Sequence, residues 1–531
     1  MTNPGSSSAT LPEALNGAEA LITTLVAAGV DVCFMNPGTS EMHFVGALDS
    51  VPAMRGVLAL FEGVATGAAD GYARIAGRPA AVLVHLGPGL SNGLANLHNA
   101  GRAHTPVLCV VGAHATGHVR YDAPLQSDIQ AAASTVSRWV VTSGTTRQVA
   151  EDAARAVVAT AATGGQVATL ILPADVSWGT GGQIAVPRPV PPPAPVSAEV
   201  VELAAARLAH GASSVLLLGG KALSERGLRA ASRVARATGC RLLAETFPAR
   251  MEAGAGVPPV TRLAYLAEMA ADQLADATGL ILAGARSPVS FFAYPGRASD
   301  LVPDGCTAGE LADPSQDVVA ALEDLAALLA PGTAPALADY RPDPPEPGAL
   351  NVTSLAAAIA ATLPDQAVVV DEANTSGMAL PTALAGSARH TLLTLTGGAI
   401  GQGMPAATGA AVAAPGRPVL SIESDGSALY TIQSLWTQAR ERLDVTTIVV
   451  NNAAYDILRM ELARTGAGQA GERSARMLDL SDPTPSFTDI AAGFGVPARR
   501  AGTSEDLTKA LRDAYAHPGP HVIEAIVPAL F

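Results

Sequence analysis

Short runs of aliphatic and β-branched residues alternate with longer alanine-rich stretches along the whole chain. Clear examples of the apolar runs are residues 80–84, 107–111, 214–218, 279–282 and 367–370. Apolar runs without polar alternation are typical of strands buried on both faces, and the alanine-rich stretches between them are typical of crossover helices. The pattern therefore predicts an α/β protein built from doubly wound parallel sheets.

Two proline-rich stretches, residues 186–196 and 341–348, interrupt this alternation. Closely spaced prolines fix φ and remove backbone donors, so neither stretch can hold a helix or a central strand, and both should run extended. They divide the chain into an N-terminal domain over residues 1–186, a central domain over 197–340 and a C-terminal domain over 349–531. A chain of 531 residues has room for about three domains.

The most informative local pattern is a strand–helix–strand unit over residues 418–452. Its first strand runs into Ser424-Asp425-Gly426, and its second ends just before Asn452, 27 positions after Asp425. This is the length of one βαβ crossover, so Asp425 and Asn452 should lie together at the carboxyl edge of a parallel sheet. A carboxylate and an amide oxygen suit a hard cation that keeps phosphate oxygens as further ligands. Taken singly, the Asp-Gly dipeptide at 425–426 and the Asn-Asn dipeptide at 451–452 are each more typical of a turn.

A second pattern follows the strand that ends at Glu62. The next dozen residues, as far as Arg74, consist largely of glycine and alanine, which allow close backbone approach on nearly every face. Glu62 falls at the start of this predicted helix, where the helix dipole stabilises a carboxylate. From the residues alone, Glu62 is either a helix-capping residue beside a tight core or a functional carboxylate.

Composition excludes several classes of partner. The net charge of −14 argues against a nucleic acid, whose phosphates would be repelled. Cys33, Cys109, Cys240 and Cys306 are widely spaced, so neither a zinc site nor a disulfide framework is predicted, and a reducing cytoplasm is the simplest location. Residues 1–10 lack the apolar core of a signal peptide. Residues 391–416 carry no charge, but their glycines, with Gln402 and Pro405, favour a loop and a packed helix over a membrane span.

Together these segments resemble the thiamine diphosphate-dependent enzymes. The C-terminal unit is similar to the family's Gly-Asp-Gly…Asn-Asn motif, with Ser424 in place of the first glycine, and the segment from Glu62 to Arg74 resembles the pyrimidine-binding domain. The resemblance covers most of the chain, in the family's order, and points to the non-oxidative decarboxylases and carboligases, which include the acetolactate synthase large subunit and benzoylformate decarboxylase. Because a serine restricts φ and crowds a diphosphate, we expect Ser424 to affect cofactor affinity.

The resemblance implies thiamine diphosphate and Mg²⁺ as cofactors. Glu62 would hydrogen-bond N1′ of the aminopyrimidine and so favour the tautomer that activates the thiazolium carbon. Ile400 would support the bent cofactor, and the Gly398 carbonyl would accept a hydrogen bond from N4′. The other implied residues are Asn374, Thr375, Gly426, Ser427 and Tyr455 for the cofactor, and Asp425, Asn452 and the Ala454 carbonyl for Mg²⁺. From the residues alone, Ile400 also fits a core position, and residues 371–376 also fit a helix N-cap.

Several positions bear on the substrate, which the resemblance implies to be a small 2-keto acid. Thr39, in Asn36-Pro-Gly-Thr-Ser-Glu41, matches a carboxylate-contacting position of benzoylformate decarboxylase. His85 matches a catalytic histidine of that enzyme and could relay protons, although a lone histidine after a strand is more often structural. A second catalytic histidine has no counterpart, because Phe292 or its neighbour stands in its place.

Further positions distinguish the two groups of relatives. Glu461 replaces part of a more aromatic stretch and makes the pocket less suited to a phenyl ring, whereas Gln126 resembles a glutamine near the acetolactate synthase site. The central block lacks the Arg-Phe-Asp-Asp-Arg type of stretch that accompanies flavin in acetolactate synthases, and its Leu218-Gly-Gly-Lys221 turn is not a GxGxxG fingerprint. FAD is therefore not expected.

The sequence leaves three activities open. Decarboxylation and carboligation of 2-keto acids share an intermediate, which a proton captures in decarboxylation and a second carbonyl compound captures in carboligation. His85 favours decarboxylation, whereas the missing second histidine favours carboligation. A non-catalytic regulatory or partner subunit with the same fold is supported by Ser424 and opposed by the presence of Glu62, Asp425 and Asn452. The resemblance also implies a homodimer or homotetramer with active sites at subunit interfaces.

Overall fold

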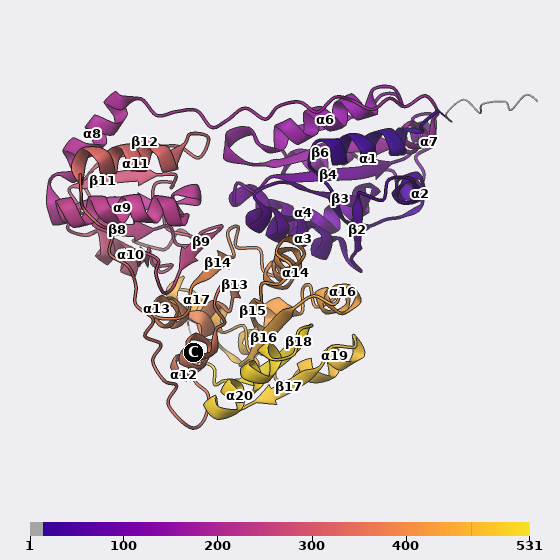
Figure 1. Cartoon of the computed structure of the whole chain (residues 1–531). Helices are drawn as coiled ribbons and strands as arrows, with labels where there is room; N and C mark the ends of the chain where they lie inside the picture. Colours follow the sequence, from indigo (N-terminus) through magenta and orange to yellow (C-terminus); the bar gives the residue numbers. More distant parts are fainter. Residues whose placement is uncertain (1–13, 469) are drawn as a thin grey trace, which may run out of the picture.

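The computed structural model describes residues 14–468 and 470–531 and arranges them around three open sheets (Figure 1). The N-terminal and central sheets lie beside each other at the top of the view, and the C-terminal sheet lies below them. The predicted architecture of three parallel-sheet α/β units is confirmed. The signal-peptide prediction for residues 1–10 falls outside the described residues.

The N-terminal sheet has six parallel strands. In spatial order they are β2 (Arg55–Leu58), β1 (Val32–Asn36), β3 (Ala80–His85), β4 (Val107–Ala113), β6 (Val167–Pro173) and β5 (Trp139–Thr142). One face packs against α1 (Gly17–Ala27), α2 (Met42–Ser50), α6 (Val149–Thr160) and α7 (Ala174–Trp178). The other face packs against α3 (Glu62–Ala76), α4 (Leu86–Arg102) and α5 (Ile129–Ser134). Because both faces are covered, the strands are almost wholly apolar.

The central sheet has five parallel strands and four main helices. The strands, in spatial order, are β10 (Thr261–Arg262), β8 (Arg241–Ala244), β7 (Ser214–Leu218), β11 (Gly279–Ala283) and β12 (Thr307–Ala312). The helices are α8 (Ala198–Leu208), α9 (Glu225–Thr238), α10 (Ala267–Leu274) and α11 (Val318–Leu329). Neither proline-rich stretch forms a helix or strand element, as predicted.

The C-terminal sheet has seven strands, six of them parallel. Their spatial order is β17 (Ala498–Ala501), β18 (His521–Ile526), β16 (Val445–Asn451), β15 (Val419–Ser424), β13 (Ala367–Glu372), β14 (His390–Thr394) and β9 (Met251–Ala253). The helices are α12 (Val352–Thr362), α13 (Leu380–Ala385), α14 (Gly403–Ala413), α15 (Asp425–Ala428), α16 (Ser434–Glu441), α17 (Asp456–Arg464), α18 (Glu472–Arg476), α19 (Phe487–Gly493) and α20 (Ser504–Tyr515).

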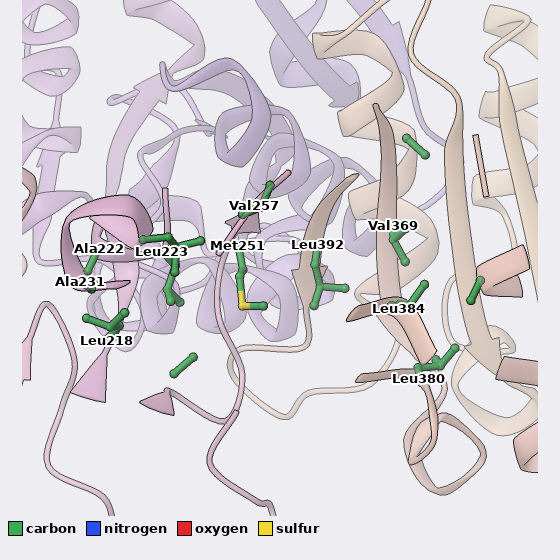
Figure 2. Packing of buried hydrophobic residues seen from close by; sticks show 14 of the residues in the cluster. Leu218, Ala222, Leu223, Ala231, Met251, Val257, Val369, Leu380, Leu384 and Leu392 are labelled. Atoms are coloured by element: carbon green, nitrogen blue, oxygen red, sulfur yellow. The ribbon is translucent and has the colours of Figure 1, made fainter. Parts of the chain in front are cut away.

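Strand β9 comes from the central block but pairs antiparallel with β14, at the edge of the C-terminal sheet. It lies in a buried apolar cluster that continues from the central sheet into the C-terminal sheet, where Met251 stands between Leu223 and Leu392 (Figure 2). Burying this continuous apolar surface holds the two units together.

Helices α3 and α14 join the N-terminal and C-terminal units (Figure 1). A Cβ added at Gly71 would lie 2.0 Å from the carbonyl oxygen of Ala406, so the two backbones are in direct contact. The small residues after Glu62 are therefore explained by helix packing across the two units. The charge-free residues 391–416 form β14, a glycine-rich loop and the buried helix α14. Within the described ranges, no helix is both long and apolar enough to cross a membrane.

Candidate active site

The metal ligands predicted from the sequence meet at the carboxyl edge of the C-terminal sheet. Asp425 follows β15, and Asn452 follows the adjacent strand β16. Asp425 Oδ2 accepts a hydrogen bond from the N–H of Asn452 at 3.2 Å, and Asn452 Oδ1 accepts one from the N–H of Ala454 at 3.1 Å. Burial raises the pKa of Asp425, although surrounding backbone N–H groups favour its charged form. The turn thus gathers one carboxylate, one amide oxygen and a nearby carbonyl.

The chemistry of this donor set fits Mg²⁺. Across residues 14–468 and 470–531, no three His, Cys, Asp or Glu side chains are grouped as metal ligands. The expected ligands include only one such side chain, Asp425, because the other donors are amide, carbonyl, phosphate and water oxygens. A magnesium ion that keeps several phosphate and water ligands requires few protein carboxylates.

Ser424, the departure from the family motif, adopts an unstrained backbone conformation. Its φ and ψ are −77° and 152°, in the extended region that any residue occupies. The Asn374 amide donates to its hydroxyl at 2.6 Å, and the Ser427 hydroxyl lies 2.9 Å away. The expectation that the side chain restricts the backbone is therefore wrong at this position, and Ser424, Asn374 and Ser427 form one polar cluster beside Asp425.

The other predicted cofactor residues surround this cluster. The ring of Tyr455 covers Gly426 so closely that an added Cβ would lie 2.4 Å from the ring. Thr375 is buried in the turn after β13. Gly398 is exposed and Ile400 is half-buried on the loop before α14, so Ile400 is accessible to a ligand and is not a core residue. This distribution fits a cradle for an elongated, phosphate-bearing ligand.

Glu372, at the end of β13, is a buried carboxylate that the sequence analysis did not single out. Its Oε1 accepts from the N–H of Gly401 at 2.6 Å and its Oε2 from the N–H of Gly403 at 2.5 Å. Burial raises its pKa to about 7, although these N–H groups lower it. The neighbouring Glu423 is also buried, and its pKa lies well above the usual range because of burial and of the facing charge of Glu372. Two carboxyl groups therefore lie beneath the glycine-rich loop.

On the N-terminal side, Glu62 begins α3, as predicted, and is half-buried. Its Oε2 accepts a hydrogen bond from the Asn92 amide at 3.0 Å. The side chain is therefore directed toward α4, which follows the strand that ends at His85. Glu62 is not packed as a helix cap in a closed core, so it remains accessible to a ligand.

His85 forms a pair with Glu41, a residue of the Asn36–Glu41 motif to which the sequence analysis assigned no role. His85 Nδ1 lies 2.7 Å from Glu41 Oε2, and the same oxygen accepts from the N–H of Gly38 at 2.7 Å. Glu41 is fully buried, and burial raises its pKa. Because Oε2 already accepts one N–H, we assign the proton to Nδ1, which leaves Nε2 of His85 free to exchange a proton. Thr39 lies on the same turn.

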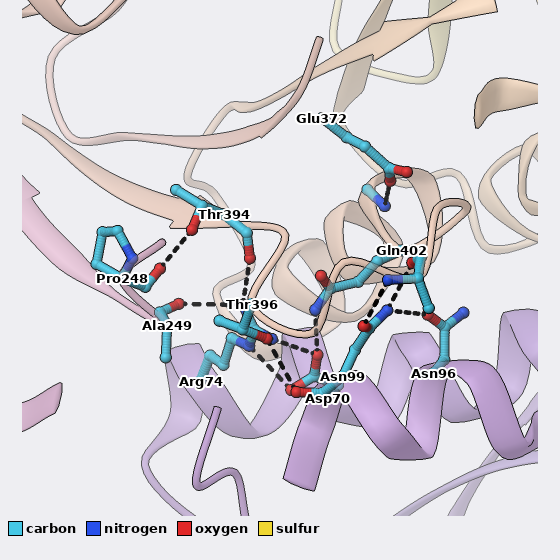
Figure 3. A network of polar contacts seen from close by, with 12 residues as sticks. Asp70, Arg74, Asn96, Asn99, Pro248, Ala249, Glu372, Thr394, Thr396 and Gln402 are labelled. Atoms are coloured by element: carbon cyan, nitrogen blue, oxygen red, sulfur yellow. Dashed lines mark hydrogen bonds and ion pairs between the residues drawn. The ribbon is translucent and has the colours of Figure 1, made fainter. Parts of the chain in front are cut away.

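Two asparagines of α4 link the two sides of the site (Figure 3). The Asn96 amide donates to the carbonyls of Gly63 at 2.8 Å and Gly401 at 3.1 Å, so the residues that follow Glu62 and Ile400 share one side chain. Asn99 donates to the Ala399 carbonyl at 2.8 Å and accepts from its N–H at 3.2 Å. The loop that contains Gly398 and Ile400 is thus tied to the N-terminal unit within a single chain.

Three substrate-related predictions have specific outcomes. Phe291, the neighbour of Phe292, lies beside Gly398, because a Cβ at Gly398 would be 3.8 Å from the Phe291 ring. Glu461 accepts from the Tyr294 hydroxyl at 2.9 Å and pairs with Arg464, so its charge is already engaged. Gln126 lines a cavity of about 560 Å³ in the N-terminal unit with Leu86, the residue after His85.

Comparison with known proteins identifies related sequences over nearly the whole chain. Residues 15–134 match the N-terminal thiamine pyrophosphate (TPP) binding domain of TPP enzymes, and residues 373–525 match the C-terminal TPP binding domain. The chain is 59% identical to the "Putative acetolactate synthase large subunit IlvX" of Mycobacterium tuberculosis, over 97% of this chain and 100% of that protein. It is 30% identical to benzoylformate decarboxylase of Pseudomonas aeruginosa, over 93% and 96% of the two chains.

Solved structures share the fold. A thiamine diphosphate-dependent 4-hydroxybenzoylformate decarboxylase from Rhodococcus jostii superposes with a TM-score of 0.85 at 24% identity, over 97% of this chain and 99% of that chain. Benzoylformate decarboxylase from Polynucleobacter necessarius superposes with a TM-score of 0.81 at 20% identity, over 97% and 99% of the chains. At these identities the likeness shows the three-sheet fold alone.

The conformation of Ser424 generates a prediction about stability. We expect Ser424→Ala to destabilise the protein by about 1 kcal/mol, because it removes the hydroxyl that Asn374 and Ser427 contact. Ser424→Gly should be less stable still, because it also increases the freedom of the unfolded chain. Thermal unfolding of the cofactor-free proteins compares them. A Ser424→Gly variant more stable than wild type would mean that the serine is strained.

Proposed function

Because the chain belongs to the thiamine pyrophosphate-dependent enzyme family, we propose that it is a thiamine diphosphate- and Mg²⁺-dependent enzyme that decarboxylates or carboligates 2-keto acids. The observations that support this most are the contact of Asp425 with Asn452 in one turn of the C-terminal sheet and the Asn96 amide, which bonds the residue after Glu62 and the residue after Ile400. When bound, the cofactor supplies a nucleophilic carbon and an electron sink for the loss of CO₂. The proposal includes no flavin.

The residues of the C-terminal unit would hold the cofactor. Asp425, Asn452 and the Ala454 carbonyl would bind Mg²⁺, which neutralises the diphosphate charge. The polar groups of Asn374, Thr375 and Ser427 and the surface formed by Gly426 and Tyr455 would bind the diphosphate end. Ile400 and the Gly398 carbonyl would orient the ring system. These groups bind and orient, and none needs to change its protonation.

The residues of the N-terminal unit would handle protons and the substrate. Glu62 would hold a proton beside the pyrimidine ring, and the Asn92 amide keeps its carboxyl in place. His85 would deliver or remove a proton at Nε2, since Glu41 holds Nδ1. Thr39, on the turn next to Glu41, would donate a hydrogen bond to the substrate carboxylate. The position of His85 supports decarboxylation, in which this residue would deliver a proton, and the apolar ring of Phe291 lies beside Gly398.

The rival interpretation, a non-catalytic subunit with the same fold, gains no support from backbone strain at Ser424. That residue was its main basis, and its backbone is unstrained. We therefore retain the catalytic proposal and place it between acetolactate synthase-like and benzoylformate decarboxylase-like activity.

We also propose a homodimer or homotetramer with active sites at subunit interfaces. Large apolar side chains are exposed on the elements that form the two sides of the site; they are Leu60, Met378, Tyr430, Leu458 and Met477. Exposed apolar residues of this size on elements around one site favour association. We expect light scattering at assay concentrations to give a dimer or tetramer. A fully active monomer would contradict this part of the proposal.

Glu62→Gln should abolish the release of CO₂ from a panel of 2-keto acids without unfolding the protein. The amide has nearly the same shape as the carboxyl and can still accept from Asn92, but it cannot take up and release a proton as the carboxyl does. Thermal unfolding and calorimetric cofactor binding control for the fold. Wild-type rates in Glu62→Gln would refute the assignment, and no cofactor binding by the wild type would favour the non-catalytic rival.

His85→Ala should lower decarboxylation by at least about tenfold, because it removes a general acid–base group, whose contribution is typically about 10²–10⁴-fold. Glu41→Gln should cause a smaller loss, because His85 remains but loses the carboxylate that holds Nδ1. His43→Ala, an exposed histidine on α2, is the matched control and should leave the rate unchanged. Equal rates in His85→Ala and His43→Ala would return His85 to a structural role.

A further inference from the structure

Glu372 occupies an unusual position for a charged side chain. It is 2% exposed, it stands at the carboxyl end of a central strand, and each carboxyl oxygen accepts one backbone N–H of the loop that leads into α14. Of the two donors, Gly401 follows Ile400 directly, and Gly403 lies on the other side of Gln402. In its ionised form, a carboxyl group with two such short bonds forms charge-assisted hydrogen bonds with fixed geometry.

The peptide that Glu372 anchors is held from several directions. The Gly401 carbonyl accepts from the Asn96 amide at 3.1 Å and from the Thr431 hydroxyl at 3.0 Å, while its N–H donates to Glu372. Asn99 holds Ala399 by both its N–H and its carbonyl. The N-terminal unit therefore holds the loop from one side, and Glu372 and Thr431 hold it from the C-terminal unit.

We propose that Glu372 is a positioning residue that fixes the loop of Gly398 and Ile400 at the distance and orientation that the cofactor site requires. This inference rests on the function proposed above for its catalytic consequence, but the anchoring of the loop can be measured without any cofactor. Glu372 acts through the peptide groups of Gly401 and Gly403 and not by contact with a substrate.

Glu423 provides a matched control. It is the register partner of Glu372 on β15 and is equally buried. In the described part of the chain its carboxyl accepts only from the Ser421 hydroxyl, at 2.7 Å, and its second oxygen has no hydrogen-bond partner. A glutamine at position 423 can still accept from Ser421, and its NH₂ can donate to the facing carboxylate of Glu372. A glutamine at position 372 must instead direct its NH₂ at a backbone N–H, which replaces a hydrogen bond with a repulsive contact.

The test compares Glu372→Gln with Glu423→Gln in the full chain. Hydrogen–deuterium exchange, measured without cofactor, should be at least about tenfold faster in Glu372→Gln for the amides of residues 397–404, because an amide loses protection when its acceptor is lost. Glu423→Gln should exchange like the wild type there. In the enzyme loaded with cofactor, kcat of Glu372→Gln should fall by about 10²-fold, because a displacement of the loop by about 1 Å costs a rate of that size. KM for the 2-keto acid should stay nearly unchanged.

Each contrary outcome is distinct. Unchanged loop exchange in Glu372→Gln, or equal changes in both variants, would overturn the positioning role even if the enzyme is active. Faster exchange of the loop amides in Glu372→Gln, together with a wild-type protein that has no activity, would overturn the proposed function. The anchoring of the loop by Glu372 would still stand. If Glu372→Gln does not fold, Thr431→Val removes another tie to the same peptide with little change in shape; wild-type exchange and wild-type kcat in that variant would refute the inference.

Discussion

The buried ion pair between Asp70 and Arg74 is the interaction on which the mutual placement of the three sheets depends. Both side chains are almost fully buried, and Arg74 Nη2 lies 2.7 Å from Asp70 Oδ2. Two charges withdrawn from water are tolerated only when their remaining hydrogen-bonding groups are satisfied, and removal of one partner from such a pair costs about 3–5 kcal/mol. Arg74 also donates to the carbonyls of Ala249, before β9, and Thr394, at the end of β14 (Figure 3). The pair is therefore fully bonded only when all three units meet.

This constraint has a direct consequence for the site. Gln402 lies on the loop that Glu372 anchors, and its amide donates a hydrogen bond to Asp70 Oδ2 at 2.5 Å. The ion pair and the loop therefore belong to one polar network. The backbone contact at Gly71 then brings α3 and α14 together, and with them the segments of Glu62 and Ile400. A site held in place by buried contacts before any ligand arrives loses little free energy to ordering when the ligand binds.

The sequence predicts those features whose causes are local. The βαβ spacing places Asp425 and Asn452, and the small residues after Glu62 indicate close helix packing, although they do not identify the partner helix. Glu41 and Glu372 escape such reasoning because their partners lie far along the chain: His85 is 44 positions from Glu41, and Gly401 is 29 positions from Glu372. The backbone restriction expected at Ser424 was wrong because a general preference for glycine says nothing about the φ adopted at one position, whereas the effect of Ser424 on cofactor affinity stays a prediction. Likewise, nothing in residues 251–253 indicates that they join a sheet of another block.

The central claim is that residues of the N-terminal unit and residues of the C-terminal unit supply the two ends of one cofactor site, which the proposed assembly completes at a subunit interface. Hydrogen–deuterium exchange of the wild-type protein, with and without thiamine diphosphate and Mg²⁺, tests it most directly. The account predicts that saturating cofactor protects two sets of peptides together: those around Glu62 and Asn92, and those around Asp425 and Asn452. Protection confined to one set, or protection of neither, would contradict it.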